Sequence, residues 1–287
     1  MNKRFLLLLY FLSAYLFATP LLAEQFQAPV TDTRWQVVES PLECSLTQDI
    51  PGFGDAGFYR RNGAPLQLFF NTHSHPAEQN NVLFQIAPAP WQNSDETQSL
   101  ISLPTTAGQT RFMIQGNVAL EAFAQLQEGR FPFIEYRSQS FPTNIRVMLS
   151  TVRLNDSLPA FEQCLQNLYP DAFDKISKLT LYFALGKATL DAQSKEALDR
   201  LANYVKLDDS IRQIRISSHT DTSGRRRINE SLSDARAHAV KTYLVETHQI
   251  PADLIQVQSF VDHKPAASNK TLEGRARNRR AEITLLR

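Results

Sequence analysis

The chain has 287 residues, of which 43% are hydrophobic and 21% are charged, a balance typical of folded proteins and not of disordered chains. This length suits one large domain or two of ordinary size. The formal net charge of +1 argues against a dedicated nucleic-acid-binding protein. After the N-terminal segment, no apolar run is long enough for a transmembrane helix.

The first 23 residues have the three parts of a secretory signal peptide. Lys3 and Arg4 are positively charged, residues 5–17 are almost purely apolar, and residues 21–23 end on a small side chain, as signal peptidase requires. We expect cleavage before Glu24 and a periplasmic mature protein; an uncleaved membrane anchor is the alternative, although the apolar stretch is short for a span. Because no cysteine follows the cut, we do not expect a lipoprotein anchor.

Export from the cytoplasm affects the expected redox state of the two cysteines, Cys44 and Cys164. In an oxidising compartment such a pair favours a disulfide over two buried thiols. The bridge would close a loop of about 120 residues, and chain entropy predicts about 4–5 kcal/mol of stabilisation for such a loop. Neither cysteine has the spacing of a metal site, and we expect no metal.

Charge divides the mature chain into two units. Residues 24–174 contain eight arginines, no lysine and sixteen acids, a net charge of −8, whereas residues 175–287 carry +7. This reversal predicts two domains with different partners, 24–174 and 175–287, with a boundary near residues 169–171.

The first unit is predicted to be rich in β-strands. Apolar and polar residues alternate in several runs separated by turn signals, and two helical stripes cover residues 118–127 and 157–168. Cys164 lies on the second stripe, so the disulfide would hold this helix to the first strands. A metal site at His73-Ser74-His75 is an alternative that we set aside for a solvated turn. The alternating runs are residues 34–38, 66–70, 82–86, 111–114 and 145–149.

The second unit is predicted to be an α/β sandwich of order β-α-β-α-β-β. Strand patterns cover residues 179–184, 214–216, 255–260 and 281–286, and helical patterns cover residues 192–206 and 229–246. This order places both helices on one face of a mixed sheet.

Two sequence blocks carry a specific resemblance. They read Ser218-His219-Thr220-Asp221-x2-Gly224-x4-Asn229-x2-Leu232-Ser233-x2-Arg236-Ala237 and Asn269-x-Thr271-x2-Gly274-Arg275-x2-Asn278-Arg279-Arg280. With these blocks in this order, residues 175–287 resemble the OmpA-like peptidoglycan-binding domain. The resemblance implies that Asp221 and Arg236 bind the diaminopimelate of the stem peptide.

The chemistry of that ligand suits these residues. Diaminopimelate presents an ammonium and a carboxylate on one carbon, so that Asp221 can accept from the ammonium while the Arg236 fork holds the carboxylate. Loop N–H groups around Thr220 would bind further ligand oxygens. An Asp221–Arg236 salt bridge that only ties loop to helix is the alternative.

The remaining polar residues of the blocks have less defined roles. We expect Asn229 to cap its helix and shape the loop, and one of Arg279 and Arg280 to reach ligand while the other pairs internally. Residues 225–227, three arginines, are expected to form a solvated loop facing glycan. Ser218 and Ala184 stand where the family commonly has glycine and an acid, which puts full affinity in question.

The whole chain resembles the MotY family of sodium-type flagellar motor proteins. The signal peptide, the acidic β-rich unit with Trp35, and the cysteine pair that brackets it fit that organisation. The resemblance implies a structural T-ring component without catalytic residues or cofactor, which binds peptidoglycan, MotX and the flagellar basal body and positions the PomA–PomB stator. The alternatives are a general envelope tether and a cell-wall hydrolase.

Overall fold

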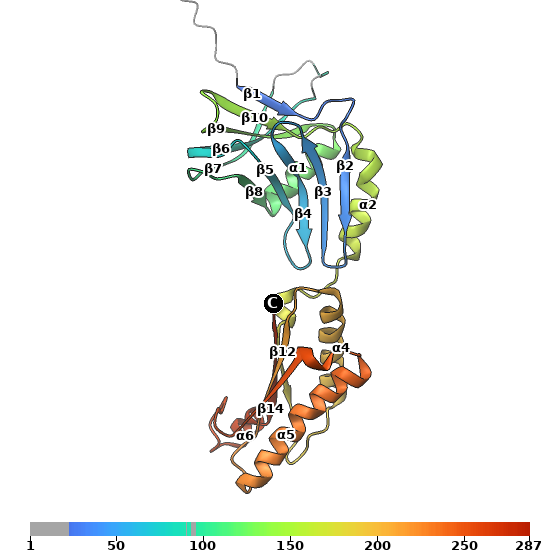
Figure 1. Ribbon diagram of the computed structural model, residues 1–287, viewed down its shortest axis with the longest axis vertical. Helices are drawn as coiled ribbons and strands as arrows, with labels where there is room; N and C mark the ends of the chain where they lie inside the picture. Colours follow the sequence, from blue (N-terminus) through green and yellow to red (C-terminus); the bar gives the residue numbers. More distant parts are fainter. Residues whose placement is uncertain (1–22, 90, 93–95) are drawn as a thin grey trace, which may run out of the picture.

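The computed structural model describes residues 23–89, 91–92 and 96–287, so the signal peptide expected at 1–23 lies, except for Ala23, outside the described residues. The molecule has two lobes arranged end to end, and the chain passes from one to the other between α2 and β11 (Figure 1). Within the described ranges, no helix has the length and apolarity needed to cross a membrane.

The N-terminal lobe contains two five-stranded sheets. All neighbouring strands are antiparallel except β1 and β10, which are parallel. The first sheet has the order β1 (Glu24–Gln27), β10 (Asn144–Met148), β9 (Phe131–Ser138), β6 (Ala77–Ala87) and β7 (Gln98–Pro104). The second has the order β2 (Trp35–Glu39), β3 (Glu43–Ile50), β4 (Gly54–Arg61), β5 (Gln67–Thr72) and β8 (Arg111–Gln115).

Aromatic side chains join the two sheets into one core. Phe70 of β5 lies 6.2 Å from Phe84 of β6, and Phe112 of β8 lies 4.3 Å from Tyr136 of β9, measured between ring centroids. The helices α1 (Asn117–Gln127) and α2 (Leu154–Asn167) add to the same cluster. The β-rich lobe expected from the sequence is therefore confirmed.

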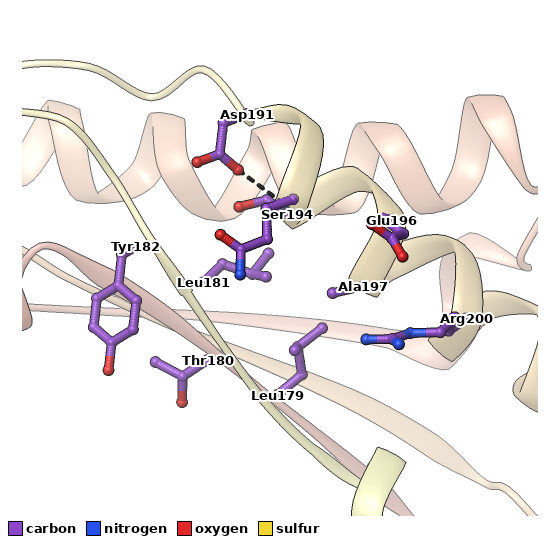
Figure 2. A pocket seen from close by; sticks show the side chains of 10 residues that line it. Leu179, Thr180, Leu181, Tyr182, Asp191, Ser194, Glu196, Ala197 and Arg200 are labelled. Carbon is purple, nitrogen blue, oxygen red and sulfur yellow. Dashed lines mark hydrogen bonds between the residues drawn. The ribbon is translucent and has the colours of Figure 1, made fainter. Parts of the chain in front are cut away.

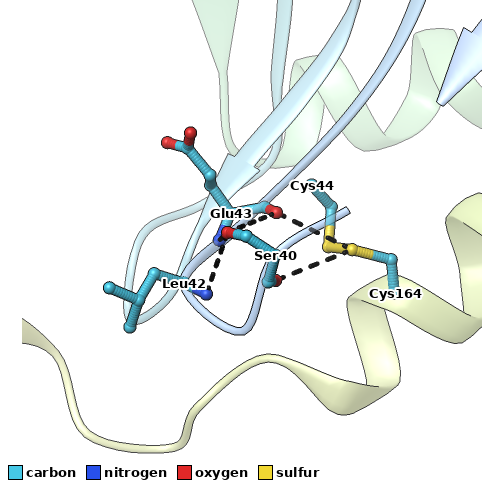
Figure 3. Close-up of a disulfide and its surroundings, with 5 residues drawn as sticks. All are labelled: Ser40, Leu42, Glu43, Cys44 and Cys164. Carbon is cyan, nitrogen blue, oxygen red and sulfur yellow. Dashed lines mark hydrogen bonds between the residues drawn. A yellow bond between two sulfur atoms is a disulfide. The ribbon is translucent and has the colours of Figure 1, made fainter. Parts of the chain in front are cut away.

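The disulfide between Cys44 and Cys164 is present and joins β3 to the last turns of α2, with the two Cα atoms 5.9 Å apart (Figure 3). Both cysteines are buried in the main core. The bridge thus holds α2 on the sheet, as the sequence predicts.

The histidine pair is only partly a solvated turn. His73 is exposed, but His75 is buried, and its Nε2 lies 2.8 Å from the carbonyl oxygen of Gly52. The rings of Phe26 and Phe141 lie 4.9 and 5.1 Å from the His75 ring. The expectation of a solvated turn is wrong for His75, because its ring fills an aromatic cluster. Among the described residues, no group of three His, Cys, Asp or Glu side chains is placed to hold a metal ion.

The C-terminal lobe is a four-stranded mixed sheet covered on one face by helices. The strand order is β11 (Lys178–Tyr182), β14 (Arg280–Leu286), β12 (Gln213–His219) and β13 (Ile255–Val261). The helices α4 (Ala192–Leu207) and α5 (Arg226–Thr242) share one core with the inward side chains of the sheet. Four shorter helical segments complete the lobe: α3 (Phe173–Ile176), η1 (Tyr243–Thr247), η2 (Ala252–Leu254) and α6 (Leu272–Asn278).

The expected β-α-β-α-β-β order is present, with α6 as an additional helix between the last two strands. The strand and helix patterns of the sequence do not predict this helix. Thr271 caps α6 by accepting a hydrogen bond from the Gly274 N–H, a pattern typical of helix starts.

The two lobes contact each other at a joint to which both lobes contribute residues. Leu42, at the β2–β3 turn, is buried in the core of the C-terminal lobe. Arg61 of the N-terminal lobe lies 3.7 Å from Asp208 of the C-terminal lobe. Two hydrogen bonds tie the connecting segment back to the N-terminal lobe: the Asn62 side-chain amide donates to the Asp171 carbonyl over 2.6 Å, and the Tyr169 N–H donates to the Pro41 carbonyl over 2.7 Å.

Candidate functional site

A small pocket opens where β12 ends and α5 begins. Its volume is about 110 Å³. The residues of the first sequence block that line it come from the β12–α5 loop and from α5. The other lining residues come from the loop after β11 and from the end of α6, directly before β14. The lining is Leu185, Gly186, Thr220, Asp221, Ser223, Ile228, Asn229, Leu232, Arg236 and Arg279.

Asp221 is fixed from three sides. Its Oδ2 accepts from Arg279 Nη1 over 2.9 Å, and its Oδ1 accepts from the Ser223 N–H over 2.9 Å. Its backbone oxygen accepts from the Asn229 side-chain amide over 3.1 Å. The carboxylate is nearly buried, with 4% of its side chain exposed, so it is held as a preorganised acceptor.

Arg236 is buried and binds main-chain oxygens. Its Nε donates to the Lys187 carbonyl over 3.0 Å and its Nη1 to the His219 carbonyl over 2.9 Å. Its Nη2 lies 3.4 Å from the Ala184 carbonyl oxygen, and its guanidinium carbon lies 5.1 Å from the centre of the Phe183 ring. Three of its five N–H donors are used in this way.

Burial also affects the charge of Arg236. It lowers the pKa of the guanidinium to about 10, the nearby Arg279 adds to that shift, and Asp221 opposes it. The group therefore stays cationic at neutral pH. The pocket combines this buried cation with the Asp221–Arg279 ion pair.

The structure does not support the alternative of an Asp221–Arg236 salt bridge. Asp221 and Arg236 line one pocket, but the ion pair of Asp221 is with Arg279. Arg279 and Arg280 are both paired internally: Arg280 donates to Glu282 over 2.6 Å and to the Lys264 carbonyl over 3.2 Å. Only Arg279 of these two lines the pocket.

Asn229 does not cap α5. The helix begins at Arg226 with Arg225 at the cap position, so Asn229 lies inside the first turns. Its side chain shapes the loop by bonding Asp221. The expected capping role is wrong because the arginines 225–227 are partly helical; the Arg226 side chain pairs with Glu230 over 3.0 Å on the exposed surface.

Other residues of the two sequence blocks fix the backbone around the pocket. The Thr220 side chain is buried and its N–H donates to the Val261 carbonyl over 2.8 Å. His219 stacks on Phe260 with ring centroids 5.4 Å apart. In the second block, the buried Asn278 side chain bonds both the Ala266 and Ala267 N–H groups, which fixes the loop before α6.

The two departures from the family pattern have local explanations. The Ser218 hydroxyl donates to the Ser233 carbonyl over 2.7 Å, and its backbone is not in the left-handed region. Glycine is thus not required there by conformation. Ala184 is exposed and contributes its carbonyl to Arg236.

A larger pocket, of about 430 Å³, lies between β11 and the first turns of α4 (Figure 2). Asp191 at its margin accepts from the Ser194 N–H over 2.8 Å and so caps α4. The other charged lining residues, Glu196 and Arg200, are one turn apart on the same helix. No acid and base from separate elements converge in it, and the smaller pocket is the better candidate site.

Comparison with known proteins covers both lobes. Residues 26–170 match the MotY N-terminal domain, and residues 182–279 match the OmpA family. Outer membrane protein Omp38 of Acinetobacter baumannii is 38% identical over 108 residues, which are 38% of this chain and 30% of that protein. The solved structure of the cell wall anchor of the T6SS from Pseudomonas aeruginosa is 31% identical and covers 38% of this chain and 80% of that one, with a TM-score of 0.34.

One relative aligns along nearly the whole chain. The sodium-type flagellar protein MotY of Vibrio parahaemolyticus is 31% identical over 268 residues, which are 92% of this chain and 91% of that protein. With both lobes matched in order, the chain belongs to the MotY family and carries a C-terminal domain of the OmpA family.

Proposed function

We propose that this protein is a periplasmic structural component of the flagellar motor that is anchored to peptidoglycan through the Asp221–Arg236–Arg279 pocket. The observation that carries the proposal is the pocket itself, where a preorganised carboxylate lies beside two guanidinium groups. The full-length relative named as a sodium-type flagellar protein supports the motor role.

The ligand of this pocket is the diaminopimelate of the stem peptide. Its ammonium binds Asp221, and its carboxylate accepts from Arg279 and Arg236, which line the same pocket. Asp221 already pairs with Arg279. Ligand binding would replace this ion pair with two, one between Asp221 and the ligand ammonium and one between Arg279 and the ligand carboxylate. No turnover is involved.

The acidic N-terminal domain, residues 24–174, faces the motor in this proposal. It binds MotX and the basal body, and a T-ring of such subunits positions the PomA–PomB stator around the rotor. Many modest wall contacts in a ring share the load that torque places on each subunit.

The test is a gene deletion complemented with wild type, Asp221→Asn or Asp234→Asn. Asp234 is exposed on α5 outside the pocket and is the matched control. A hydrogen bond to a charged group contributes about 1.5–3 kcal/mol, so Asp221→Asn should weaken binding of purified protein to sacculi about tenfold or more. The melting temperature of each variant is checked first.

The expected phenotype is intact but paralysed flagella in the deletion strain, with swimming restored by wild type and Asp234→Asn and not by Asp221→Asn. Sacculus binding by Asp221→Asn at the wild-type level would refute the assigned pocket. Normal swimming of the deletion strain would refute the motor role and favour a general envelope tether.

A further inference from the structure

The outer edge of β11 carries main-chain groups that have no partner in the sheet. β11 is the last strand of the C-terminal sheet, and among the described strands it pairs with β14 alone. Ser177 and Phe183, next to its two ends, are each joined to the β14 side by a main-chain hydrogen bond of 2.8 Å. Because such bonds alternate along an antiparallel pair, Lys178, Thr180 and Tyr182 direct their N–H and C=O groups away from β14.

β11 lacks most of the features that commonly protect a sheet edge. Its register with β14 is unbroken, it contains no proline, and its one protective feature is the charged side chain of Lys178. The strand at the opposite edge, β13, differs. Its register with β12 shifts between Ser218 and His219, and it ends on Val261 in a left-handed conformation, with a φ of 52°. Such irregular backbone disfavours the pairing of a further strand, whereas the β11 edge permits it.

A groove runs along this free edge. The pocket of about 430 Å³ between β11 and α4 continues into a second one of about 210 Å³, because both are lined by Leu179, Ala197 and Arg200. Leu179 and Ala197 are half-buried and give the groove an apolar floor. Figure 2 shows the residues of β11 and those of α4 on opposite sides of the first pocket. A segment in the groove would therefore contact the strand edge and the apolar floor together.

The spacing of the unpaired groups indicates what fits the groove. Every second residue of β11 directs an N–H and a C=O outward, at a repeat of about 6.6–6.8 Å. An extended polypeptide presents its own N–H and C=O groups at the same repeat, and each second side chain then points to the floor. A sugar chain has no such alternating pair of groups. The edge is thus complementary to the main chain of another strand.

The charges along the groove add a polarity. Asp191 and Glu196 line the first pocket near the start of α4. Arg200 lies about two and a half turns after Asp191 on the same helix, and Lys175 and Asp171 join it in the second pocket. One end of the groove is therefore acidic and the other has more cations than acids. A complementary segment carries a basic side chain at the first end and an acidic one at the second.

We infer that the β11 edge binds an extended segment of a partner polypeptide, which adds a fifth strand to the C-terminal sheet. The segment has apolar side chains at alternate positions and opposite charges at its two ends. None of the residues that line the groove lines the Asp221 pocket, so that both sites can be occupied at once. The C-terminal domain thereby has a protein-binding surface separate from its candidate ligand pocket.

The first test selects linear octapeptides from a phage-displayed library on the mature wild-type protein. Thr180→Pro removes one outward N–H and places a ring at the edge, and proline is tolerated in an edge strand whose N–H faces solvent. Thr180→Ala changes the side chain alone and is the matched control. We expect selected peptides to bind wild type and Thr180→Ala about tenfold more tightly than Thr180→Pro. Sacculus binding should be the same for all three proteins, because Thr180 lies outside the Asp221 pocket.

The second test needs no variant of the protein. The best selected peptide is synthesised with a methyl group on one main-chain nitrogen at a time. Methylation at every second position should weaken binding about tenfold, and methylation at the positions between should have little effect. In amide hydrogen exchange followed by NMR, the peptide should slow exchange at Thr180 and Tyr182, while Leu179 and Leu181 keep their rates.

Each measurement can overturn the inference. Selected peptides that bind Thr180→Pro as tightly as Thr180→Ala would do so, as would a selection that yields no binding peptide. Methylation effects without alternation, or unchanged exchange at Thr180 and Tyr182, would show that the peptide does not pair with β11. The methylation series and the exchange rates decide the question if the proline lowers the melting temperature.

Discussion

Arg236 connects the loop after β11 with the end of β12. It donates to the main-chain oxygens of Ala184, Lys187 and His219. Ala184 and Lys187 lie 52 and 49 positions before Arg236 in the sequence, and His219 lies 17 positions before it. Removing the guanidinium would leave the buried His219 carbonyl without this donor, at a cost of about 1–3 kcal/mol. Loss of binding in Arg236→Ala would thus mix a structural effect with a ligand effect, which is why Asp221 is the better position to test.

His219 makes the C-terminal domain sensitive to acid. The ring stacks on Phe260, faces the cations Lys264 and Arg280, and has Glu282 at 4.0 Å. Burial, with a further contribution from Arg280, lowers the pKa of His219 to about 4, while the unfolded chain titrates near 6.5. Between these pH values, unfolding is accompanied by the uptake of a proton on His219. The contribution of His219 to the free energy of unfolding is therefore fully present above pH 6.5 and is lost as the pH falls toward 4.

We therefore expect the stability of wild type to drop by up to about 3 kcal/mol between pH 7 and pH 4 through this one group, in addition to other titrations. In His219→Gln that part of the slope should be absent, as measured by urea unfolding at a series of pH values. His238→Gln, an exposed histidine on α5, is the control. Parallel slopes for wild type and His219→Gln would contradict the assignment.

For individual residues, the sequence predicted part of the candidate site at the β12–α5 loop. The linear blocks predicted that Asp221 and Arg236 share a site, and both line one pocket. They left open which of Arg279 and Arg280 joins them, and only Arg279 lines that pocket. They could not predict that Asp221 pairs with Arg279, because that contact spans 58 positions and depends on how β14 meets the β12 loop. Leu185 and Ile228 were missed because an apolar residue in a sequence carries no sign of being exposed.

Among the secondary-structure elements, regular alternation was the reliable signal. The runs at 34–38, 66–70, 82–86, 111–114 and 145–149 all correspond to strands, and the two helical stripes correspond to α1 and α2. The runs without alternation were missed. Phe131–Ser138 forms β9, whose first four residues are all buried, so the polar and apolar alternation is confined to its second half.

The missed strands β3 and β4 have different causes. In β3 the inward positions include the polar Gln48, which exchanges hydrogen bonds of 3.0 and 2.9 Å with the backbone of Ser150. In β4, Gly57 lies against the Leu46 carbonyl so closely that no side chain fits there. Buried polar partners and close backbone approach are tertiary features that a periodic pattern does not contain.

The disulfide is the element-scale feature with the largest expected effect on stability. Replacing both Cys44 and Cys164 by alanine should lower the free energy of unfolding by about 2–5 kcal/mol, since the loop it closes spans 120 positions. Urea denaturation of the mature protein measures this loss. Reductant should have the same effect on wild type and none on the double variant; equal stability of the oxidised wild type and the variant would contradict the prediction.

For the whole molecule, the joint decides whether the two domains behave as one body. Asp208 in the C-terminal domain is buried; Arg287 lies 2.7 Å and Arg61 of the N-terminal domain 3.7 Å from its Oδ2. Leu42 of the N-terminal domain packs into the C-terminal core. A joint with apolar and ionic contacts from both domains predicts coupled unfolding.

Leu42→Ala should weaken this coupling. Truncating a buried leucine costs about 2–5 kcal/mol, and here the loss falls on the contact between domains. We expect calorimetry to show separate transitions for the two domains in the variant and closer ones in wild type. Val38→Ala, an exposed position on the adjacent strand, is the control. Identical calorimetric profiles for Leu42→Ala and wild type would show that the joint does not couple the domains.

The position of the disulfide has a mechanical consequence. The chain leaves the N-terminal domain just after Asn167, three residues beyond Cys164. If the C-terminal domain is held by the wall and the N-terminal domain by the motor, as proposed, tension between them enters at this end of α2. Without the bridge, such a pull would peel the helix from the sheet one turn at a time. With it, the force passes directly to β3, which is paired along its length with β2 and β4. The paired strands then resist the pull in shear, with many hydrogen bonds loaded at the same time and not one after another.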